Sequence, residues 1–371
     1  MESAMIERLY VHNFRCLENF TLDLSGQPSA LLIGKNGVGK STVFASLKVL
    51  QRICRGPNQA RSAIRASDFT HRRTDLPMRF ELIASISGTW FQYSVSFEWP
   101  QDVQEARILD EKLISNGAPV FVRESNVVQL LDGAKFALDP HVFALPVISQ
   151  PPPMNQLQDF KRYLAGMVLV APVPELMTGL SEEPRSGLDF RASHFASCLR
   201  ALLQYKPKAY GEFATFVQRL IPDFASIEFA ERGKEGSGQL TVTFQRPDSR
   251  EAVTLDFDQL SDGEKCFFLA GYLAASSAIG LPVVCWWDEP DNHLSISEVG
   301  QFIMAMRKIA GTGGQFVATT HHPDAIRAFA DENTFVLTRA SHLEPTVARR
   351  LSEFKYEGDL IRALTLDEII G

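Results

Sequence analysis

The chain has 371 residues, of which 45% are hydrophobic, and 37 basic against 44 acidic residues give a formal net charge of −7 at pH 7. The length and the hydrophobic fraction are enough for two or three domains, each with its own core. The net negative charge excludes a nucleic-acid-binding protein that is basic along its whole length, but it does not exclude a local basic patch. The five cysteines are scattered without a C-x-x-C pair, so neither a zinc site nor a disulfide framework is indicated. The N-terminus is charged and lacks an apolar signal region, and no apolar run reaches membrane-spanning length, which predicts a cytoplasmic protein.

Strands dominate the first part of the chain. Alternating or continuous apolar residues predict strands at residues 5–14, 20–25, 29–34, 78–86, 90–99, 107–117 and 118–125. Apolar positions at helical spacing predict a helix over residues 40–53, and an arginine-rich connection follows up to residue 73. The proline-rich residues 150–156 are the clearest loop.

The second part begins with helices and ends with alternating elements. Helices are predicted over residues 158–167, 194–205 and 208–221, with a strand at 167–173 and further strands at 225–231, 238–245 and 252–257. From residue 281 to 339, strands at 281–289, 314–320 and 334–339 alternate with helical segments at 295–310 and 322–330. That alternation predicts a parallel α/β sheet.

A glycine-rich loop lies between the buried strand at 29–34 and the helix at 40–53. Residues 34–41, GKNGVGKS, fit the pattern G-x-x-x-x-G-K-[ST] at every position, and the strand before and helix after are the context that this phosphate-binding motif requires. Lys40 can reach the β- and γ-phosphates of a nucleotide, and the Ser41 hydroxyl can bind Mg²⁺. A glycine-rich turn without a ligand is the alternative, and the strand–loop–helix context counts against it. The predicted nucleotide-binding residues are Gly34, Asn36, Gly37, Gly39, Lys40, Ser41 and Thr42.

Two acids follow the apolar strand at 281–289. Asp288 and Glu289 would lie at the carboxyl end of a parallel strand, where ligands bind in open α/β sheets. We expect Asp288 to hold Mg²⁺ through its water shell opposite Ser41, and Glu289 to polarise the attacking water. Two strand-end acids that cap the next helix are the alternative.

A polar cluster, Leu260-Ser261-Asp262-Gly263-Glu264-Lys265, stands at the start of an apolar helix. It resembles the signature motif of ABC-type ATPases, in the L-S-x-G-E form of SMC, RecF and OLD-type proteins. Three matches follow the same family's order: the D-loop-like PDNHL after Glu289, a switch-histidine strand with His321, and N-terminal strands that include Asn13-Phe14-Arg15. The resemblance to compact bacterial RecF/OLD-like ATPases covers nearly the whole chain. The ordered set of four motifs is specific to that family, whereas the similarity in the middle of the chain is not.

The resemblance implies a head-to-tail dimer or higher oligomer of the chain. Each ATP would lie between the phosphate loop of one subunit and the signature of the other, where Ser261, Gly263 and the helix N-terminus contact the γ-phosphate. His321 would sense the γ-phosphate, Asp291 would belong to the nucleotide-binding set, and Arg15 would approach the nucleotide, with a surface turn as its alternative role. The catalytic residues would be Glu289, His321 and Lys40, with Ser41 and Asp288 at the metal.

The implied fold is a P-loop NTPase of the ABC type: an α/β head with a mixed or parallel core sheet, an antiparallel β-subdomain and a helical insertion. We expect an N-terminal ATPase lobe at 1–150, a helical insertion or lid at 151–230 and a C-terminal ATPase lobe at 231–371. The glutamine that senses Mg²⁺ in this family cannot be placed, since Gln51, Gln59 and Gln92 are all candidates. Asp256-x-Asp258 lacks the context of a Toprim nuclease, so no nuclease centre is expected here.

Six arginines, Arg52, Arg55, Arg61, Arg65, Arg72 and Arg73, occur in residues 52–73 with Asp68 as the only acid. They predict a contact with a nucleic-acid backbone or with the acidic face of a partner, and a solvated surface is the alternative. We therefore expect a Mg²⁺-dependent ATP hydrolase that acts as an ATP-gated sensor or clamp in DNA repair or anti-phage defence, with a separate nuclease or toxin chain. The alternative is an ATP-dependent scaffold that holds a protein partner without nucleic acid. A small-molecule kinase leaves the signature and His321 unexplained.

Overall fold

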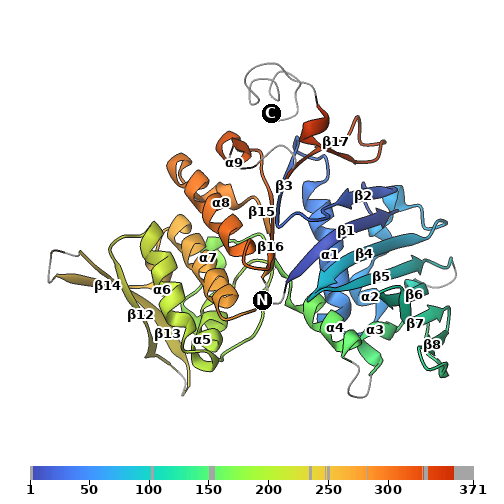
Figure 1. Ribbon diagram of the computed structural model, residues 1–371, viewed down its shortest axis with the longest axis horizontal. Coiled ribbons are helices and arrows are strands. Elements are labelled where there is room, and N and C mark those ends of the chain that lie inside the picture. The colour runs from blue at the N-terminus through green and yellow to red at the C-terminus, as the bar shows by residue number, and fades with distance from the viewer. Residues whose placement is uncertain are drawn as a thin grey trace. The chain divides into compact units, whose positions relative to one another are not determined.

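The computed structural model describes residues 3–101, 104–149, 155–233, 236–246, 248, 251–281, 283–327, 329 and 333–354, so most of the predicted loop at 150–156 lies outside the described residues. Contacts divide the chain into two compact units (Figure 1). The N-terminal unit comprises Glu2–Met167 with Phe329–Gly371, and the central unit comprises Val168–Ala328 with Met1. The predicted domain boundaries at residues 150 and 230 stay a prediction.

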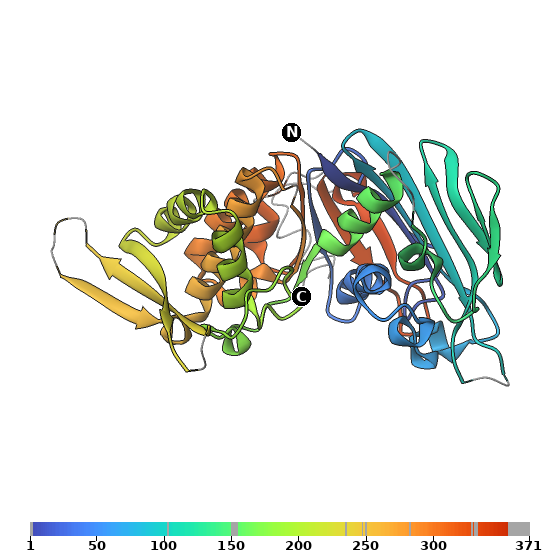
Figure 2. The same cartoon turned by 90° about the horizontal axis from the view of Figure 1, so that it is seen from below.

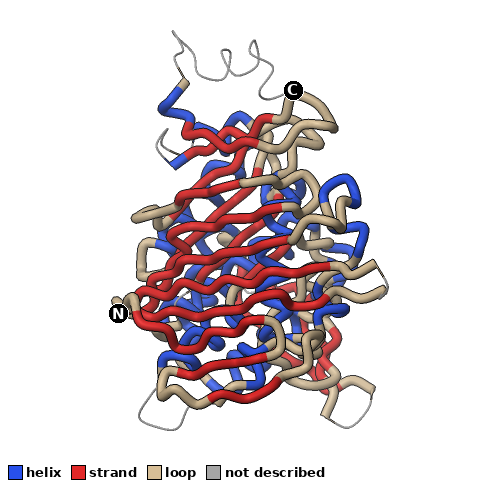
Figure 3. The backbone as a smooth tube through the Cα atoms, turned by 90° about the vertical axis from the view of Figure 1, so that its right-hand side faces the viewer, coloured by secondary structure: helices blue, strands red, loops and turns tan. Residues whose placement is uncertain are grey.

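An antiparallel sheet forms most of the N-terminal unit. Its strand order is β2-β1-β4-β5-β6-β7-β8-β9, and Figure 3 shows these strands side by side. The bounds are β1 Ala4–His12, β2 Phe20–Asp23, β4 Met78–Ile86, β5 Thr89–Glu98, β6 Arg107–Ser115, β7 Ala118–Glu124, β8 Val127–Leu130 and β9 Lys135–Ala137. Buried and partly exposed residues alternate along β4, because successive side chains of a strand point to opposite faces. The strands predicted at residues 5–14, 20–25, 78–86, 90–99, 107–117 and 118–125 are therefore confirmed, and they belong to one sheet.

Helices cover one face of this sheet. They are α1 Lys40–Arg55, α2 Ala60–Ala63, α3 Ala144–Val147 and α4 Gln156–Gly166. Both α3 and α4 contact the sheet and also α1 (Figures 1 and 2). The apolar stripe of α1 is buried, including Val43, Leu47 and Leu50. The helix predicted over residues 40–53 is confirmed.

A second, smaller set of strands carries the glycine-rich loop. β3 (Ser29–Ile33) is buried at every position and pairs in parallel with β17 (Thr334–Thr338). β17 pairs antiparallel with β18 (Val347–Arg350). Burial on both faces accounts for the apolar residues along β3. The glycine-rich loop begins at Gly34, directly after this strand.

The N-terminal unit also contains a fully buried ion pair. The carboxylate of Glu111 on β6 lies 3.7 Å from the Arg123 guanidinium on β7, and neither side chain is exposed. Glu111 accepts hydrogen bonds from the Tyr93 hydroxyl at 2.9 Å and from the backbone N–H groups of Ala144 and Leu145 at 2.6 and 2.8 Å. Burial is the main influence on the pKa of Glu111 and raises it, while these hydrogen bonds and Arg123 lower it in part. The network ties α3 to the sheet.

The central unit contains parallel strands and an antiparallel sheet. β10 (Val168–Val170), β15 (Val284–Asp288) and β16 (Gln315–Thr319) are parallel neighbours in that order. In the antiparallel sheet, β13 (Gly238–Gln245) pairs with β12 (Phe224–Glu231), β14 (Ala252–Asp256) and the two-residue β11 (Leu180–Ser181). The helices are α5 Phe195–Tyr205, α6 Ala209–Leu220, α7 Asp262–Ala278, α8 Ile296–Ala310 and α9 Pro323–Arg327, with α6 and α7 side by side (Figure 1).

Aromatic side chains fill the core beneath the parallel strands. Trp286 and Trp287 are each 1% exposed, so they are core residues and are excluded as platforms for base stacking. The Phe302 ring of α8 meets Trp287 edge-on at 5.2 Å, and the Phe267 ring of α7 lies 6.2 Å from Phe302. Among the described residues, no helix combines the length and apolar composition needed to cross a membrane.

Candidate functional site

The glycine-rich loop has the backbone that a phosphate cradle needs. Gly34, Gly37 and Gly39 have φ values of 148°, 80° and 107°, which glycine adopts without a Cβ penalty. A Cβ on Gly39 would lie 2.7 Å from the Cys16 thiol sulfur and 2.9 Å from the Thr346 hydroxyl. A Cβ on Gly37 would meet nothing within 4 Å. The end of the loop is therefore packed against its own unit, whereas its tip has room for a ligand.

Lys40 and Ser41 start α1 at the edge of this loop. The Lys40 ammonium is buried and donates to the carbonyls of Gly34 at 2.6 Å and Lys35 at 3.2 Å, which holds it across the loop. The α1 N-terminus has no side-chain cap, and Ser41 is exposed. An uncapped helix N-terminus with a lysine inside the loop and a hydroxyl at its rim fits a nucleotide triphosphate with Mg²⁺.

In the central unit, Thr319 joins the two acids at the end of β15. Asp288 and Thr319 are register partners on β15 and β16. The Thr319 hydroxyl donates to Asp288 Oδ1 at 2.5 Å and accepts from the backbone N–H of Glu289 at 3.0 Å. One buried hydroxyl therefore orients the carboxylate of Asp288 and the backbone of Glu289 together.

Glu289 has a strained backbone and a defined side-chain position. Its φ of 51° and ψ of 61° lie in the left-handed region, which is uncommon for a residue with a Cβ and is typical of functional sites. Asn292 donates from Nδ2 to Glu289 Oε2 at 2.8 Å, and His321 Nδ1 lies 3.8 Å from Oε1. The Glu289 and His321 side chains are 30% and 45% exposed, so the pair faces solvent as a site for an incoming water would.

Asp291 lies just beyond this pair and is 7% exposed. Burial raises the pKa of its carboxyl, and a hydrogen bond with Thr320 and the nearby His321 and His322 lower it in part. Among the described atoms, its Oδ1 has no hydrogen-bond partner. A buried acceptor without a hydrogen-bond partner costs stability.

The signature residues form a capped helix start. Ser261 is the N-cap of α7: its N–H and hydroxyl donate to Glu264 Oε2 at 2.8 and 2.7 Å, and its Oγ accepts from the Glu264 N–H at 3.3 Å. A Cβ on Gly263 would lie 3.0 Å from the His293 carbonyl, and His293 Nδ1 lies 3.5 Å from Asp262. A side chain at residue 263 would therefore be in tight contact with the D-loop-like segment of the same chain.

Arg15 is engaged within the N-terminal unit. It has a φ of 53°, and its guanidinium donates to Asp68 Oδ1 at 3.1 and 3.0 Å. Half of the side chain is exposed. The nucleotide contact expected for Arg15 stays a prediction.

The six arginines of residues 52–73 divide into two groups. Three have partners within the N-terminal unit: Arg61 with Glu105 at 3.3 Å, Arg73 with Glu18, and Arg55 with the carbonyl of Ala165 at 2.6 Å. The others, Arg52, Arg65 and Arg72, are exposed. Carboxylates pair with Arg61 and Arg73 and offset their share of the positive charge predicted for the cluster, although Arg55 and Arg61 are exposed as well.

The three candidate glutamines lie in different settings. Gln51 is buried in α1 and donates to the Met167 carbonyl at 2.6 Å, which is a structural role. Gln59 precedes α2, and Gln92 lies within β5. The position of a Mg²⁺-sensing glutamine is therefore not assigned.

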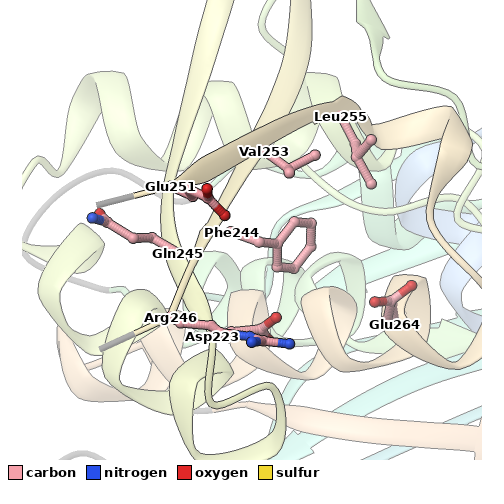
Figure 4. A pocket seen from close by; sticks show the side chains of 8 residues that line it. All are labelled: Asp223, Phe244, Gln245, Arg246, Glu251, Val253, Leu255 and Glu264. Atoms are coloured by element: carbon pink, nitrogen blue, oxygen red, sulfur yellow. The ribbon is translucent and has the colours of Figure 1, made fainter. Parts of the chain in front are cut away.

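A pocket of about 510 Å³ lies beside the signature in the central unit. Figure 4 shows its lining, in which Phe244, Val253 and Leu255 of the antiparallel sheet lie opposite Glu264 of α7. The other lining residues are Asp223, Gln245, Arg246 and Glu251. Three carboxylates against one guanidinium would repel a triphosphate, so this pocket does not compete with the glycine-rich loop for a nucleotide.

The structure thus groups the predicted site residues within each unit. Asp288, Glu289 and His321 gather at the ends of β15 and β16. Residues 34–42 form the cradle of the N-terminal unit. Sequence reasoning missed Thr319 and the role of Asn292. The signal for Thr319 was a threonine pair that ends an otherwise apolar strand.

Comparisons with known proteins agree with these motifs. The family model "AAA ATPase domain" matches residues 5–72, and the model "AAA domain, putative AbiEii toxin, Type IV TA system" matches residues 182–327. The first match includes the glycine-rich loop, and the second includes the signature, both acids and His321. No curated protein sequence matches the chain.

Among solved structures, an SMC head bound to the C-terminal winged-helix domain of ScpA has a TM-score of 0.51 at 15% identity, over 94% of this chain and 99% of that one. An SMC head with an extended coiled coil, bound to the C-terminal domain of ScpA from Pyrococcus furiosus, has a TM-score of 0.51 at 14% identity, over 94% and 97%. The SMC head domain from Thermotoga maritima has a TM-score of 0.49 at 15% identity, over 93% and 98%.

The predicted fold class, a P-loop NTPase head of the ABC type, is confirmed by the likeness to the two SMC heads bound to ScpA domains. The two family models cover the motifs on which the resemblance rests. Two AAA ATPase family models that match separate stretches of the chain, together with the fold of the SMC heads, support the resemblance to ABC-type, RecF/SMC-like ATPases.

Proposed function

We propose that this protein is a Mg²⁺-dependent ATP hydrolase whose heads dimerise on ATP. The observation that carries the proposal is the arrangement of Glu289: its backbone is strained, its N–H is bound by Thr319, and its carboxylate is held by Asn292 and faces His321. Such strain persists only where the surroundings fix it, and a carboxylate so fixed is suited to orient a water.

The roles of the chain's residues follow from their chemistry. Lys40 and the loop N–H groups bind the β- and γ-phosphates, and Glu289 accepts a proton from the attacking water, with His321 beside it. Ser41 and Asp288 would hold Mg²⁺, which neutralises phosphate charge when bound. No cluster of three or more His, Cys, Asp or Glu among the described residues could hold a metal alone, so waters and phosphate oxygens would complete the coordination.

Dimerisation would complete each ATP site. Ser261, Gly263 and the α7 N-terminus would bind the γ-phosphate held by another copy, and Asp291 and Arg15 belong to the same proposed nucleotide-binding set. Ser261 is exposed, and its Oγ is fixed at the start of α7 by the N–H of Glu264; it would donate to the phosphate after releasing the Glu264 carboxylate. ATP would then stabilise the dimer, and hydrolysis would release it.

The cellular role we propose is an ATP-gated sensor or clamp in the cytoplasm, acting in DNA repair or anti-phage defence with a separate effector chain. The exposed Arg52, Arg65 and Arg72 support contact with a phosphate backbone. The match to a model whose description names a toxin–antitoxin system supports defence. The second candidate is a scaffold for a protein partner, favoured by the paired arginines and by the similar SMC heads that are bound to ScpA domains.

Light scattering on Glu289→Gln with Mg-ATP tests the catalytic and assembly proposal. The variant cannot accept the proton of the water, so we expect a persistent dimer or larger oligomer, whereas the wild-type assembly decays as ATP is consumed. Glu212→Gln, at an exposed position of α6, is the matched control and should behave as wild type. A Glu289→Gln protein that stays monomeric in saturating Mg-ATP would contradict assembly through the signature.

A binding experiment separates the two cellular roles. The trapped Glu289→Gln assembly is mixed with short DNA and RNA duplexes at increasing salt concentration. The same titration is repeated with a Glu289→Gln protein in which Arg52, Arg65 and Arg72 are also changed to alanine. A clamp should retain duplex, and the triple substitution should lower the slope of log affinity against log salt by about 3. Assembly without retention at low salt would favour the scaffold.

A further inference from the structure

The hairpin of β17 and β18 packs against both ends of the glycine-rich loop. At the start of the loop, a Cβ on Gly34 would collide with the carbonyl oxygen of Leu337 in β17. At its end, a Cβ on Gly39 would lie 2.9 Å from the hydroxyl of Thr346, the residue directly before β18. All of these residues belong to the N-terminal unit. The loop is therefore framed by a hairpin that lies about 300 residues away in the sequence.

Thr346 uses both of its hydrogen-bond donors in this contact. Its backbone N–H donates to the Cys16 carbonyl at 2.9 Å, and its hydroxyl donates to the Val38 carbonyl at 2.6 Å. The residue is 2% exposed, so its hydroxyl has no access to bulk water. One buried side chain thus joins the hairpin to the glycine-rich loop, while its backbone joins the hairpin to the turn that follows β1.

The bond to Val38 determines how the next N–H group points. The N–H groups of Thr42 and Val43 donate to the Gly39 carbonyl, so the Val38 carbonyl is left to Thr346. A peptide group is planar and trans, and its carbonyl and N–H therefore point in opposite directions. A Val38 carbonyl directed at the hairpin turns the Gly39 N–H away from it. In the part of the chain that the structure describes, this N–H finds no acceptor.

We propose that Thr346 is a positioning residue for the nucleotide site, because its hydroxyl directs the Gly39 N–H toward a bound phosphate. Since it supports phosphate binding, this role rests on the proposed function. Backbone N–H groups of a glycine-rich loop bind phosphate oxygens. Gly39 has a φ of 107° and no Cβ, so without an anchor this peptide group would rotate readily. The Thr346 hydroxyl removes that freedom before the nucleotide binds, which lowers the entropy cost of binding.

The connection that carries Thr346 is itself ordered by internal hydrogen bonds. The Arg339 guanidinium, which follows β17, donates to the carbonyls of His342 and Glu344 at 2.6 and 2.7 Å. The Glu344 N–H donates to the Ser341 carbonyl at 3.1 Å. Beyond Thr346, β18 returns in antiparallel register with β17. The hydroxyl therefore reaches the loop from a fixed backbone, as a positioning residue requires.

A titration with fluorescent Mg-ADP tests this role on the full-length protein. ADP lacks the γ-phosphate that the proposed signature contact needs, so its Kd reports the glycine-rich loop alone. Thr346→Val removes the hydroxyl and keeps the shape of the side chain. We expect the Kd to rise about tenfold, because one hydrogen bond that orients the loop is lost. In ATP hydrolysis, KM should rise by a similar factor with kcat little changed, since the N–H serves substrate and transition state alike.

A rescue variant and a matched control complete the test. Thr346→Ser keeps the hydroxyl and should bind Mg-ADP nearly as wild type does. Ser46→Ala is the control: the Ser46 hydroxyl is also buried and donates to a backbone carbonyl at 2.6 Å, but this carbonyl, that of Val43, lies within α1. Its Kd should equal that of wild type. Thermal melts confirm that the proteins compared are folded.

The outcomes separate this role from the proposed function. Equal Kd values for wild type and Thr346→Val would overturn the role of Thr346 and leave the proposed function standing. The same holds if Thr346→Ser binds as weakly as Thr346→Val, or if Ser46→Ala loses as much affinity. A wild-type protein that binds neither Mg-ADP nor Mg-ATP would overturn both.

Discussion

Replacement of Thr319 by valine tests whether one hydroxyl organises the proposed catalytic acids. Thr319 is 1% exposed on β16, and its hydroxyl lies between Asp288 Oδ1 at 2.5 Å and the Glu289 N–H at 3.0 Å. Valine has the same shape and is equally suited to a strand, so the change removes only the hydroxyl. It therefore isolates the hydrogen bonds from packing.

The magnitude follows from which groups lose a partner. The Glu289 N–H also lies 3.2 Å from the carbonyl oxygen of Thr319, so it keeps an acceptor in the variant. Asp288 loses a hydrogen bond to a charged group, which contributes about 1.5–3 kcal/mol. We expect the free energy of unfolding at neutral pH to fall by about 2 kcal/mol. Loss of a residue that orients a metal-binding carboxylate typically weakens metal affinity by about 10–100-fold.

Two measurements on the same preparations check this expectation. Urea unfolding gives the stability, and phosphate release from ATP at varied Mg²⁺ gives the concentration for half-maximal turnover, which should rise by about 10–100-fold. Thr319→Ser keeps the hydroxyl and should restore most of both properties. A Thr319→Val protein with unchanged stability and unchanged Mg²⁺ dependence would refute the organising role of this residue.

Three further substitutions follow from the structure. Gly39→Ala should abolish nucleotide binding in a fluorescent-nucleotide titration and cost about 2 kcal/mol more in urea unfolding than Gly26→Ala, because both have positive φ but only Gly39 lacks room for a Cβ. Glu111→Gln should lower the free energy of unfolding by about 3–5 kcal/mol, since it leaves the Arg123 charge buried without its partner; an equal loss at an exposed glutamate would contradict this. Asp291→Asn should raise stability at neutral pH while impairing ATP-dependent assembly. Because burial raises the pKa of Asp291 in the folded state, the unfolded chain releases the proton first, so the native carboxylate destabilises the fold as pH rises above about 4. The gain in the variant should therefore disappear in urea unfolding below that pH, and a pH-independent gain would exclude this cause.

Local sequence patterns predicted the elements and the cradle because their causes are local. The spacing of Gly34, Gly37 and Gly39 is set by backbone conformations within one loop, and the structure has positive φ at all three. The alternation along residues 78–86 reflects a two-residue period that any half-buried strand shows. The order of the strands could not be predicted in this way, since β1 and β2 share one sheet with β4 to β9 whereas β3 lies in another.

Features that depend on register and tertiary pairing could not be predicted in this way. Thr319 meets Asp288 only because β15 and β16 are parallel neighbours in one register, and a shift by one residue would turn it to the other face. The arginine cluster read as uniformly cationic because its partners Glu18 and Glu105 are distant in sequence. A count of charges along a segment cannot identify salt bridges to other elements.

The signature and the proposed catalytic acid are linked by direct contacts within the central unit. Gly263 packs on the His293 carbonyl, and Asn292, the residue before His293, donates to the carboxylate of Glu289. The step between them is a short 3₁₀ helix, Pro290–His293, that begins at the strained backbone of Glu289. In the proposed dimer, these contacts would connect a phosphate bound at Ser261 to the carboxylate of Glu289 through Gly263, His293 and Asn292.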